Sequence, residues 1–299
     1  QEELARDAEG AAEITRMLLG DIETGEINAQ GLAELRRDVV KFANKQAQRQ
    51  SKTTNLAWAE MGPDNVGGRT RALAIHPDNE SVLYAGAVSG GLWKSIDEAN
   101  TWVQVTNFPN LMVGSIAVAG NGDIYIGTGS DFDWAGGEGN SGFRGRGIWY
   151  SSDDGQTFTV VDGTDPGEFS SGAYSSTDAL AAHPTNNDIV WFGSNSDFGY
   201  LENGQLNEVS LSGGPTGGVA DIAIASDASY MLLAATNGRV YRITGANFGE
   251  ATSIAGNGDG MLPQAGIGRT RIAISQTDPN SAFALFATPG GLFHGLHYS

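Results

Sequence analysis

Short apolar runs separated by turns rich in glycine, aspartate and asparagine recur along the chain from residue 58 to residue 299. Runs of about five residues, often with β-branched or aromatic side chains and bounded by such turns, predict β-strands. The 43 glycines have no collagen-like period, and their place between the runs indicates many tight turns. This part of the chain is therefore expected to contain many short strands.

Residues 1–50 follow a different pattern. Apolar side chains there recur three or four positions apart, for example at Leu32, Leu35 and Val39, and the segment is rich in Glu, Ala, Leu and Arg. This spacing predicts a short helical lead-in over residues 1–50, and the polar residues 51–57 are expected to form a linker. We expect two short helices within residues 1–50. Two such helices cannot build a core of their own, so they should pack on the β domain or on a partner.

The apolar runs repeat as a unit. Each unit opens with a run centred on an alanine, continues through a turn to a second run, and reaches a third run after a glycine turn. The central alanines, at positions 74, 117, 181, 223 and 273, are 43, 64, 42 and 50 residues apart. A period of about 40 to 50 residues with four strands per unit is typical of a propeller blade, whereas β-sandwiches, the alternative fold, rarely repeat in sequence. We predict an all-β fold, a β-propeller with four-stranded blades over residues 58–299, of which about five are visible.

The repeat does not close on itself within the sequence. Trp58-Ala59-Glu60-Met61 lies 44 residues before Trp102-Val103-Gln104-Val105 and has the same pattern, so we expect it to be the outermost strand of a blade. The sequence before residues 58–61 contains no apolar runs that could form the inner strands of that blade. The fifth unit reaches Ser299 just after its third run, without a fourth. The propeller is expected to be truncated here or to continue beyond residue 299.

Composition limits the classes of partner. The chain has 35 acidic and 17 basic residues, a net charge of −18, which argues against nucleic acid and anionic membrane surfaces as partners. No apolar run is long enough to cross a membrane. The absence of cysteine excludes disulfides and thiol chemistry, and the four histidines do not cluster, so no metal site or cofactor is expected.

Two motifs have the spacing Ser-x-Asp-x-Gly-x-Thr-Trp/Phe, and Ala99 replaces the glycine in the first of them. The carboxylate and hydroxyl groups of such a motif can hydrogen-bond the backbone of a turn, and its aromatic ring can pack between blades. We predict a structural role for them, away from any cleft. The residues at the motif positions are Ser95, Asp97, Thr101 and Trp102 in one copy and Ser151, Asp153, Gly155, Thr157 and Phe158 in the other.

Residues 62–74 and 85–95, together with these motifs, resemble the sortilin-like, Asp-box (bacterial neuraminidase repeat, BNR) propellers of Bacteroidota. The resemblance implies a large exported protein, secreted or held at the cell surface, of the kind carried by type IX secretion. It implies a binding or interaction propeller with a protein or glycan partner, and contact with secretion machinery or an outer-membrane protein. The start at Gln1 rather than Met fits a processed, secreted chain.

Two rival functions stay open. A glycoside hydrolase needs two carboxyl groups across a cleft. Xyloglucanase-type propellers resemble this chain and place a catalytic aspartate before the paired glycines of the first blade, but residues 87–91 hold no acid. Sialidases use an arginine triad and a Tyr-Glu pair. Arg69, Arg71, Arg269 and Arg271 form two Arg-Thr-Arg steps at blade entrances, but no Tyr-Glu pair can be assigned. No catalytic residue is predicted, and a structural component of a cell-surface assembly, docked through the helical lead-in, is the other rival.

The predicted binding site is the long loop over residues 129–147, which should share one face of the propeller with two blade entrances. Aromatic and charged side chains at a rim suit a glycan or a protein loop. Asp131, Asp133 and Glu138 offer oxygen ligands for Ca²⁺, although a solvated acidic loop is the simpler interpretation. The candidate ligand-binding residues are Arg69, Asp131, Asp133, Trp134, Phe143, Arg144 and Arg269.

Overall fold

In the computed structural model of the chain, the described residues are 69–130, 143–167, 172–215, 217–245 and 248–299. The chain divides into two compact units, residues 1–65 and 66–299, and all described residues belong to the second unit. The predicted helical lead-in, the linker and the strand at Trp58 lie outside the described residues, so they stay predictions.

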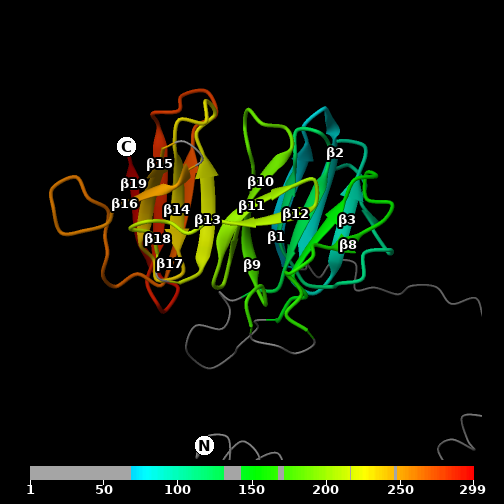
Figure 1. The fold of residues 1–299 in the computed structure, drawn as a ribbon, viewed down its shortest axis with the longest axis horizontal. Coiled ribbons are helices and arrows are strands. Elements are labelled where there is room, and N and C mark those ends of the chain that lie inside the picture. The colour runs from blue at the N-terminus through cyan, green and yellow to red at the C-terminus, as the bar shows by residue number, and fades with distance from the viewer. Residues whose placement is uncertain (1–68, 131–142, 168–171, 216, 246–247) are drawn as a thin grey trace, which may run out of the picture. The chain divides into compact units, whose positions relative to one another are not determined.

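The described residues form an all-β propeller of five antiparallel sheets, as the repeat predicts (Figure 1). Within each sheet every strand pairs with its neighbours in chain order, so each sheet is one sequential blade. No α-helix occurs among the described residues.

Blade 1 comprises β1 (Thr70–His76), β2 (Asn79–Ala87), β3 (Gly91–Ser95) and β4 (Val103–Gln104). Blade 2 comprises β5 (Val113–Val118), β6 (Ile124–Thr128), β7 (Ile148–Ser151) and β8 (Thr159–Val160). Blade 3 comprises β9 (Thr177–Ala182), β10 (Ile189–Ser194), β11 (Phe198–Glu202) and β12 (Gln205–Glu208). Blade 4 comprises β13 (Val219–Ile224), β14 (Met231–Ala235), β15 (Val240–Thr244) and β16 (Glu250–Ser253). Blade 5 has three described strands, β17 (Arg269–Ile274), β18 (Ala282–Ala287) and β19 (Phe293–Tyr298).

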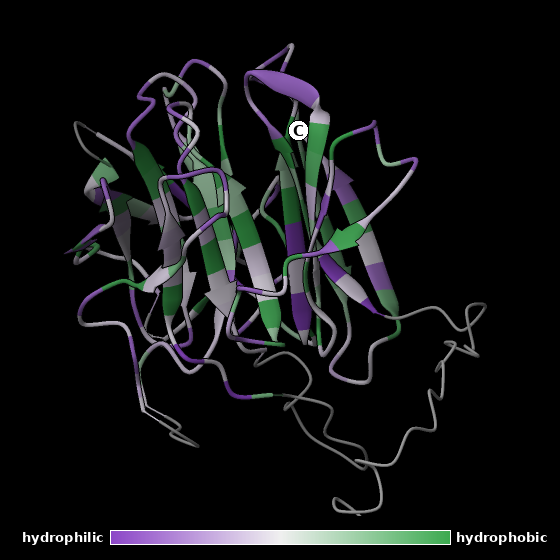
Figure 2. Cartoon of the chain, turned by 90° about the vertical axis from the view of Figure 1, so that its right-hand side faces the viewer, coloured by the Kyte–Doolittle hydropathy of each residue, from purple (hydrophilic) through white to green (hydrophobic). Residues whose placement is uncertain are grey.

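Each pair of neighbouring blades shares one apolar core, and the four cores join blade 1 to blade 2 and so on to blade 5. The strands are mostly apolar and the connecting loops mostly polar (Figure 2). Because side chains alternate between the two faces of a strand, each blade sends one set of residues toward the preceding blade and the other set toward the next. Ile116 and Val118 of β5, for example, belong to the core shared with blade 1, whereas Ala117 belongs to the core shared with blade 3.

The central alanines of the repeat have a packing role. Each pairs with a large residue of the second strand: Ala74 with Tyr84, Ala117 with Tyr125, Ala181 with Trp191, Ala223 with Leu232 and Ala273 with Phe283. In the first four blades this pair belongs to the core shared with the next blade. A small residue on the innermost strand leaves room near the axis for the large one beside it. The repeated alanine in the sequence is therefore a packing position.

Glycine is required where blades approach closely. A Cβ added at Gly86 would lie 2.2 Å from Val113 Cγ1 of the next blade, and one at Gly193 would lie 2.5 Å from Val219 Cγ1. Both glycines lie toward the end of a second strand and face the start of the next inner strand. At this place the glycine backbone packs directly on a valine side chain of the next blade, and this contact sets the spacing between the two blades.

The propeller has two distinct ends. At one end the segment that enters a blade meets the loop between its second and third strands. The bonds are Val88 N to Arg69 O (3.1 Å), Gly129 N to Met112 O (3.2 Å), Asn195 N to Ser176 O (2.9 Å), Thr236 N to Gly218 O (2.9 Å) and Gly268 N to Ala287 O (2.8 Å). We call this end the loop face. The opposite end, where the first and third turns of each blade lie, is called the turn face. In blade 1, Glu98 N in the third turn donates to Ser81 O near the start of β2 (3.1 Å).

Candidate functional site

The two predicted turn motifs lie on the turn face and hydrogen-bond within themselves. The carboxylate of Asp153 accepts bonds from Thr157 Oγ1 (2.6 Å), Thr157 N (2.8 Å), Gln156 N (3.0 Å) and Ser151 Oγ (2.8 Å). These bonds, those from Thr157 first, lower the pKa of Asp153 to about 2. Because its lone pairs are occupied by the turn, this carboxylate is not placed to act on a ligand.

Asp97 is held in the same way. It accepts bonds from Thr101 Oγ1 (2.6 Å), Thr101 N (2.8 Å) and Ser95 Oγ (2.8 Å). The glycine position of the motif has a positive φ in both copies, +80° at Gly155 and +67° at Ala99. Only glycine adopts this region at no cost, so the first copy carries a strained alanine.

A residue that sequence reasoning missed joins blades 1 and 2. Asp154, the variable position of the second motif, accepts bonds from Tyr84 Oη (2.6 Å) and Lys94 Nζ (2.7 Å), both in blade 1. Burial, and next the bond to Asp154, raise the pKa of Tyr84. Burial would raise the pKa of Asp154 as well, but the bonds from Lys94 and Tyr84 outweigh it and lower that pKa. The motif does not specify which residue stands at the position of Asp154, so the sequence pattern could not predict its contact with blade 1.

Two ion pairs lie at the loop-face ends of the inner strands. Arg71 Nη2 of β1 lies 2.6 Å from Asp178 Oδ1 of β9, and Arg271 Nη1 of β17 lies 3.4 Å from Asp221 Oδ1 of β13. The Ser176 hydroxyl also donates to Asp178. The two Arg-Thr-Arg steps in the sequence thus place one arginine each in a pair with an acid of another blade.

The environment of Asp221 is that of a structural carboxylate. It accepts bonds from the backbone N–H groups of Ile272 (3.0 Å) and Ile222 (3.1 Å), and Arg271 also donates to Ala220 O (2.8 Å). Burial raises the pKa of Asp221, and the Arg271 charge opposes this shift. The group links blades 4 and 5 on the loop face.

The loop predicted to bind ligand leaves the propeller on this same face. Its two ends are tied by Ser130 N to Phe143 O (2.9 Å), and its second end is tied to blade 3 by Gly145 N to Ser175 O (2.7 Å). Arg146 forms a two-pronged pair with Asp165 (2.9 and 2.8 Å) that lowers the pKa of Asp165 to about 2. The base of the loop is therefore fixed in place.

The predicted ligand-binding residues divide into two groups. Arg69, Phe143, Arg144 and Arg269 are described, and all four lie on the loop face. Arg69 is exposed, Arg144 and Arg269 are partly exposed, and the Phe143 side chain is 43 % exposed. Asp131, Asp133 and Trp134, with Glu138 of the possible Ca²⁺ set, lie outside the described residues. Within the described part of the chain, no group of three or more His, Asp or Glu side chains is arranged to hold a metal.

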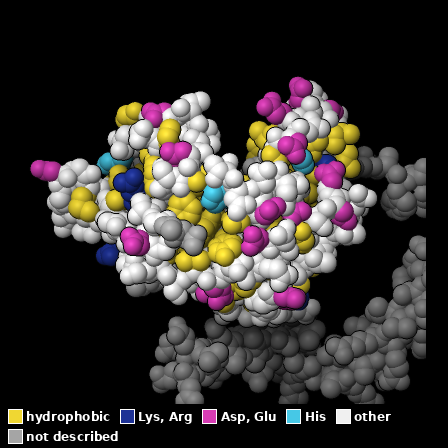
Figure 3. Space-filling view, turned by 45° about the horizontal axis from the view of Figure 1, so that its top comes forward, with side chains coloured by type: hydrophobic (Ala, Val, Ile, Leu, Met, Phe, Trp, Pro, Cys, Tyr) yellow, Lys and Arg dark blue, Asp and Glu magenta, His cyan; other side chains and the backbone are white. Residues whose placement is uncertain are grey.

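A hollow of about 510 Å³ opens on the turn face between the inner strands. Figure 3 views this end, where hydrophobic side chains gather between two lobes of the surface. Its lining comes from all five blades and includes Pro77, Val118, Ala181, Ala223 and Ala273. His183 at its edge has a pKa lowered by burial, and its Nδ1 accepts a bond from Asn186 N (3.0 Å), which indicates a structural role in the turn.

No protein-family model matches the chain. A xyloglucanase of Paenibacillus sp is 44 % identical over 61 residues, which is 19 % of this chain and 6 % of that enzyme. A probable oligoxyloglucan-reducing end-specific xyloglucanase of Neosartorya fischeri is 35 % identical over 75 residues, 22 % of this chain and 9 % of the relative. The matches therefore span less than a tenth of either relative's length.

Solved structures share the fold at low identity. The GH74 xyloglucanase of Xanthomonas campestris has a TM-score of 0.50 and 18 % identity over 78 % of this chain and 36 % of its own. The GH74 enzyme of Niastella koreensis has a TM-score of 0.52 and 18 % identity over 77 % and 38 %. Virginiamycin B lyase of Staphylococcus aureus has a TM-score of 0.50 and 12 % identity over 81 % and 73 %. These likenesses support the propeller fold.

Proposed function

We propose that this chain forms part of an extracellular propeller that binds a polysaccharide of the xyloglucan class on its loop face. The proposal rests on the local sequence match to two proteins named xyloglucanases, with identities of 44 % and 35 %. The propeller fold shared with GH74 enzymes supports it. Location outside the cell, export by the type IX route and a cell-surface protein partner belong to the same proposal, and the resemblance to sortilin-like propellers supports them.

The chemistry of the loop face suits a sugar chain. Protein sites for neutral ligands combine apolar or aromatic surface with a few placed polar groups. Phe143 offers an exposed ring at the base of the loop, Arg69 and Arg269 are donors beside blade entrances, and Trp134 belongs to the same loop. An extended polysaccharide running across these blade entrances would meet donors and rings in turn.

Binding without hydrolysis is favoured by the state of the two described acids at the inner-strand ends of this face. Asp178 and Asp221 are the carboxylates at the inner-strand ends, and each is engaged by an arginine of another blade. Glycoside hydrolysis needs one carboxylic acid that can give up a proton and a second carboxylate beside the sugar. Two carboxylates engaged in structural pairs serve that chemistry poorly. Because both relatives are named xyloglucanases, hydrolysis of the polysaccharide is the alternative function.

Affinity gel electrophoresis of the full chain tests this proposal. Gels containing soluble xyloglucan should retard the chain, and gels containing a mannan or no polysaccharide should not. The variant with Trp134→Ala and Phe143→Ala should migrate freely in xyloglucan. Ile96→Ala, which removes an exposed apolar side chain from the turn face, should be retarded like the parent chain. Equal mobility of the parent chain in all gels would refute the proposal.

A reducing-sugar assay with the same xyloglucan separates the two functions. The binding propeller should release no reducing ends above the level of a heat-denatured sample. Release of reducing ends would establish the hydrolase, and the Asp178→Asn and Asp221→Asn variants would then show whether either acid takes part.

A further inference from the structure

The inner strands of the blades differ in chemistry between their two ends. At the loop face they carry polar and charged side chains, such as the paired Arg71 and Asp178. At the turn face they end on apolar residues that line the hollow of about 510 Å³, among them Val118, Ala182, Ile224 and Ile274. We call this hollow the central hollow. Among the described residues that line it, none is Asp, Glu, Lys or Arg, so it suits an apolar side chain.

The central hollow is open to solvent. Pro77, Pro184 and Ala273 line it and are exposed, and Figure 3 shows the hydrophobic side chains of this face gathered in the depression between two lobes. Exposed apolar surface with a polar rim is typical of interaction sites. The chemistry of the rim therefore indicates which kind of partner would be accepted.

Acidic side chains surround the central hollow, as the Asp and Glu side chains in Figure 3 show. The first turns of blades 1, 2, 3 and 5 supply part of its lining. None of the five first turns, all of which are described, contains a lysine or an arginine. The first turns of blades 1, 3, 4 and 5 carry exposed carboxylates, namely Asp78, Glu80, Asp188, Asp227 and Asp278. The rim is therefore negatively charged on four blades.

These carboxylates are not neutralised by cations of the described chain. The Ser229 and Ser281 hydroxyls are the first causes that lower the pKa of Asp227 and of Asp278, and such bonds hold a carboxylate in its charged form. In the described part of the chain, no hydrogen bond or ion pair engages the carboxylates of Asp78 and Glu80. Lys94, which is also on this face, already pairs with Asp154 at 2.7 Å.

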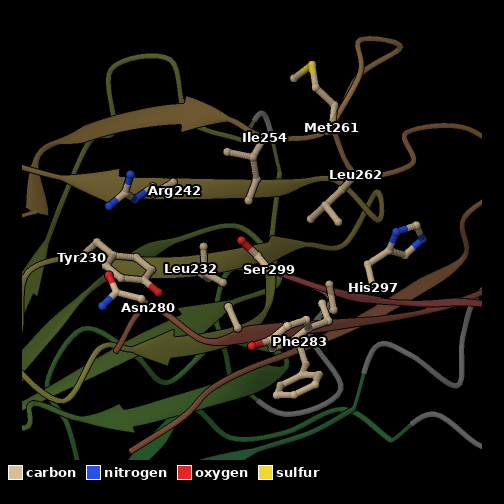
Figure 4. Close-up of a pocket in the computed structure, with 14 residues that line it drawn as sticks. Tyr230, Leu232, Arg242, Ile254, Met261, Leu262, Asn280, Phe283, His297 and Ser299 are labelled. Atoms are coloured by element: carbon tan, nitrogen blue, oxygen red, sulfur yellow. The ribbon is translucent and has the colours of Figure 1, made fainter. Parts of the chain in front are cut away.

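A larger cavity between blades 4 and 5 has the opposite character. Its volume is about 700 Å³, and it shares no lining residue with the central hollow. Figure 4 shows Arg242 and Tyr230 at one end of it, where the guanidinium lies 4.6 Å from the ring centroid, with Leu262 farther along. Asp and Glu do not occur among its described lining residues. A cationic ligand therefore fits the central hollow better than this cavity.

The charges of the described residues are segregated between the two faces. Apart from Arg242, the described arginines lie on the loop face: Arg69, Arg71, Arg144, Arg146, Arg239, Arg269 and Arg271. A positively charged partner is therefore attracted to the turn face and not to the loop face. Complementary charge of this kind steers a partner to one surface and selects among partners.

We propose that the turn face binds a basic polypeptide segment that seats one apolar side chain in the central hollow. Lysine or arginine residues on both sides of that apolar residue lie beside the acidic first turns. The apolar lining disfavours a cation inside the hollow, whereas the rim attracts cations, so an apolar residue flanked by basic ones satisfies both. This surface is at the opposite end of the propeller from the proposed polysaccharide site, so the inference does not rest on that function.

Fluorescence anisotropy of the full chain with the fluorescein-labelled peptide Lys-Arg-Lys-Leu-Lys-Arg-Lys tests the proposal. The parent chain should bind this peptide saturably, and the peptide with serine in place of leucine should bind roughly tenfold more weakly, because the hollow then takes up no apolar side chain. Ala273→Arg, which places a cation in the hollow, should weaken binding of the leucine peptide by a similar factor. Asp78→Asn with Glu80→Gln should also weaken it, by less at high salt than at low salt.

A charge-matched control separates a defined site from general attraction to a chain of net charge −18. Asp162→Asn with Asp197→Asn removes two negative charges from the loop face and should bind the leucine peptide like the parent chain. A loss equal to that of the Asp78/Glu80 variant would refute the proposal. Failure of the parent chain to bind, or equal binding of the serine and leucine peptides, would also overturn it. The peptide comparison uses the unaltered chain, so it decides the matter even where a variant unfolds.

Discussion

Arg71 and Asp178 are 107 residues apart in the sequence, and their side chains meet at 2.6 Å. Arg71 belongs to the inner strand of blade 1 and Asp178 to that of blade 3, so the pair bridges two blades that are not neighbours in chain order. Both side chains are nearly buried, 9 % and 3 % exposed. Gly114 of blade 2 lies between the two strands, and a Cβ there would lie 2.4 Å from Gly129 O and 3.0 Å from Thr177 O. The small residue allows three blades to meet at one point of the loop face.

This pair should show strong coupling in a double-mutant cycle. Removing one partner leaves a buried charge without its counter-charge, so Arg71→Met and Asp178→Asn should each lower the free energy of unfolding by about 3 to 5 kcal/mol. The double variant should lose less than the sum of the single losses, because neither charge then remains. Urea unfolding followed by tryptophan fluorescence measures all four chains. Additive losses would show that the pair does not act as a unit.

The strained alanine on the turn face predicts a stabilising substitution. Ala99→Gly should raise the free energy of unfolding by about 1 kcal/mol, since glycine adopts a φ of +67° without the Cβ conflict. The reverse change in the second motif, Gly155→Ala, should lower it by about the same amount. An added Cβ at Gly155 meets its nearest atom at 3.5 Å, so backbone strain alone is tested there. A loss of stability in Ala99→Gly would contradict the conformation of this turn.

Asp153 predicts a defined dependence of stability on acid. The turn lowers its pKa from 3.8 to about 2, with the bonds from Thr157 as the first cause. A carboxylate with a lowered pKa stabilises the fold fully above pH 3.8, and its contribution is lost as the pH falls toward 2. The stability difference between the parent chain and Asp153→Asn should therefore shrink between these two pH values. A difference that is constant over the range would show that the carboxylate charge has no role. Ligand binding at neutral pH should be the same in both chains.

The blades could be predicted from the sequence because their signal is local. A run around Ala117, a turn and a second run around Tyr125 recur at similar spacing in every unit, and each is decided by neighbours in the chain. The motif turns follow for the same reason, since Asp153 bonds only to residues within four positions. Local periodicity does not show which faces of the blades pack together. Because similar units follow one another in the chain, however, each blade is expected to pack on its neighbours in sequence, and few other arrangements are available.

Contacts between blades could not be predicted in the same way. Asp154 occupies a variable position of its motif, and only the packing of blade 2 on blade 1 brings it to Tyr84, 70 residues away. The sequence placed arginines at the blade entrances but gave no sign that Arg71 and Arg271 face Asp178 and Asp221. Such pairs depend on the distance and rotation between sheets. Of the predicted binding loop, Phe143 and Arg144 lie on the expected face, whereas Asp131, Asp133 and Trp134 are outside the described residues.

Isothermal titration of the full chain with soluble xyloglucan oligosaccharide tests the proposed binding role most directly. The account predicts a saturable binding heat, an affinity at least tenfold weaker in the Phe143→Ala variant, which corresponds to about 1.4 kcal/mol, and an unchanged affinity in Ile96→Ala on the opposite face. The absence of binding heat in the parent chain at millimolar ligand, or an affinity that Phe143→Ala leaves unchanged, would contradict it.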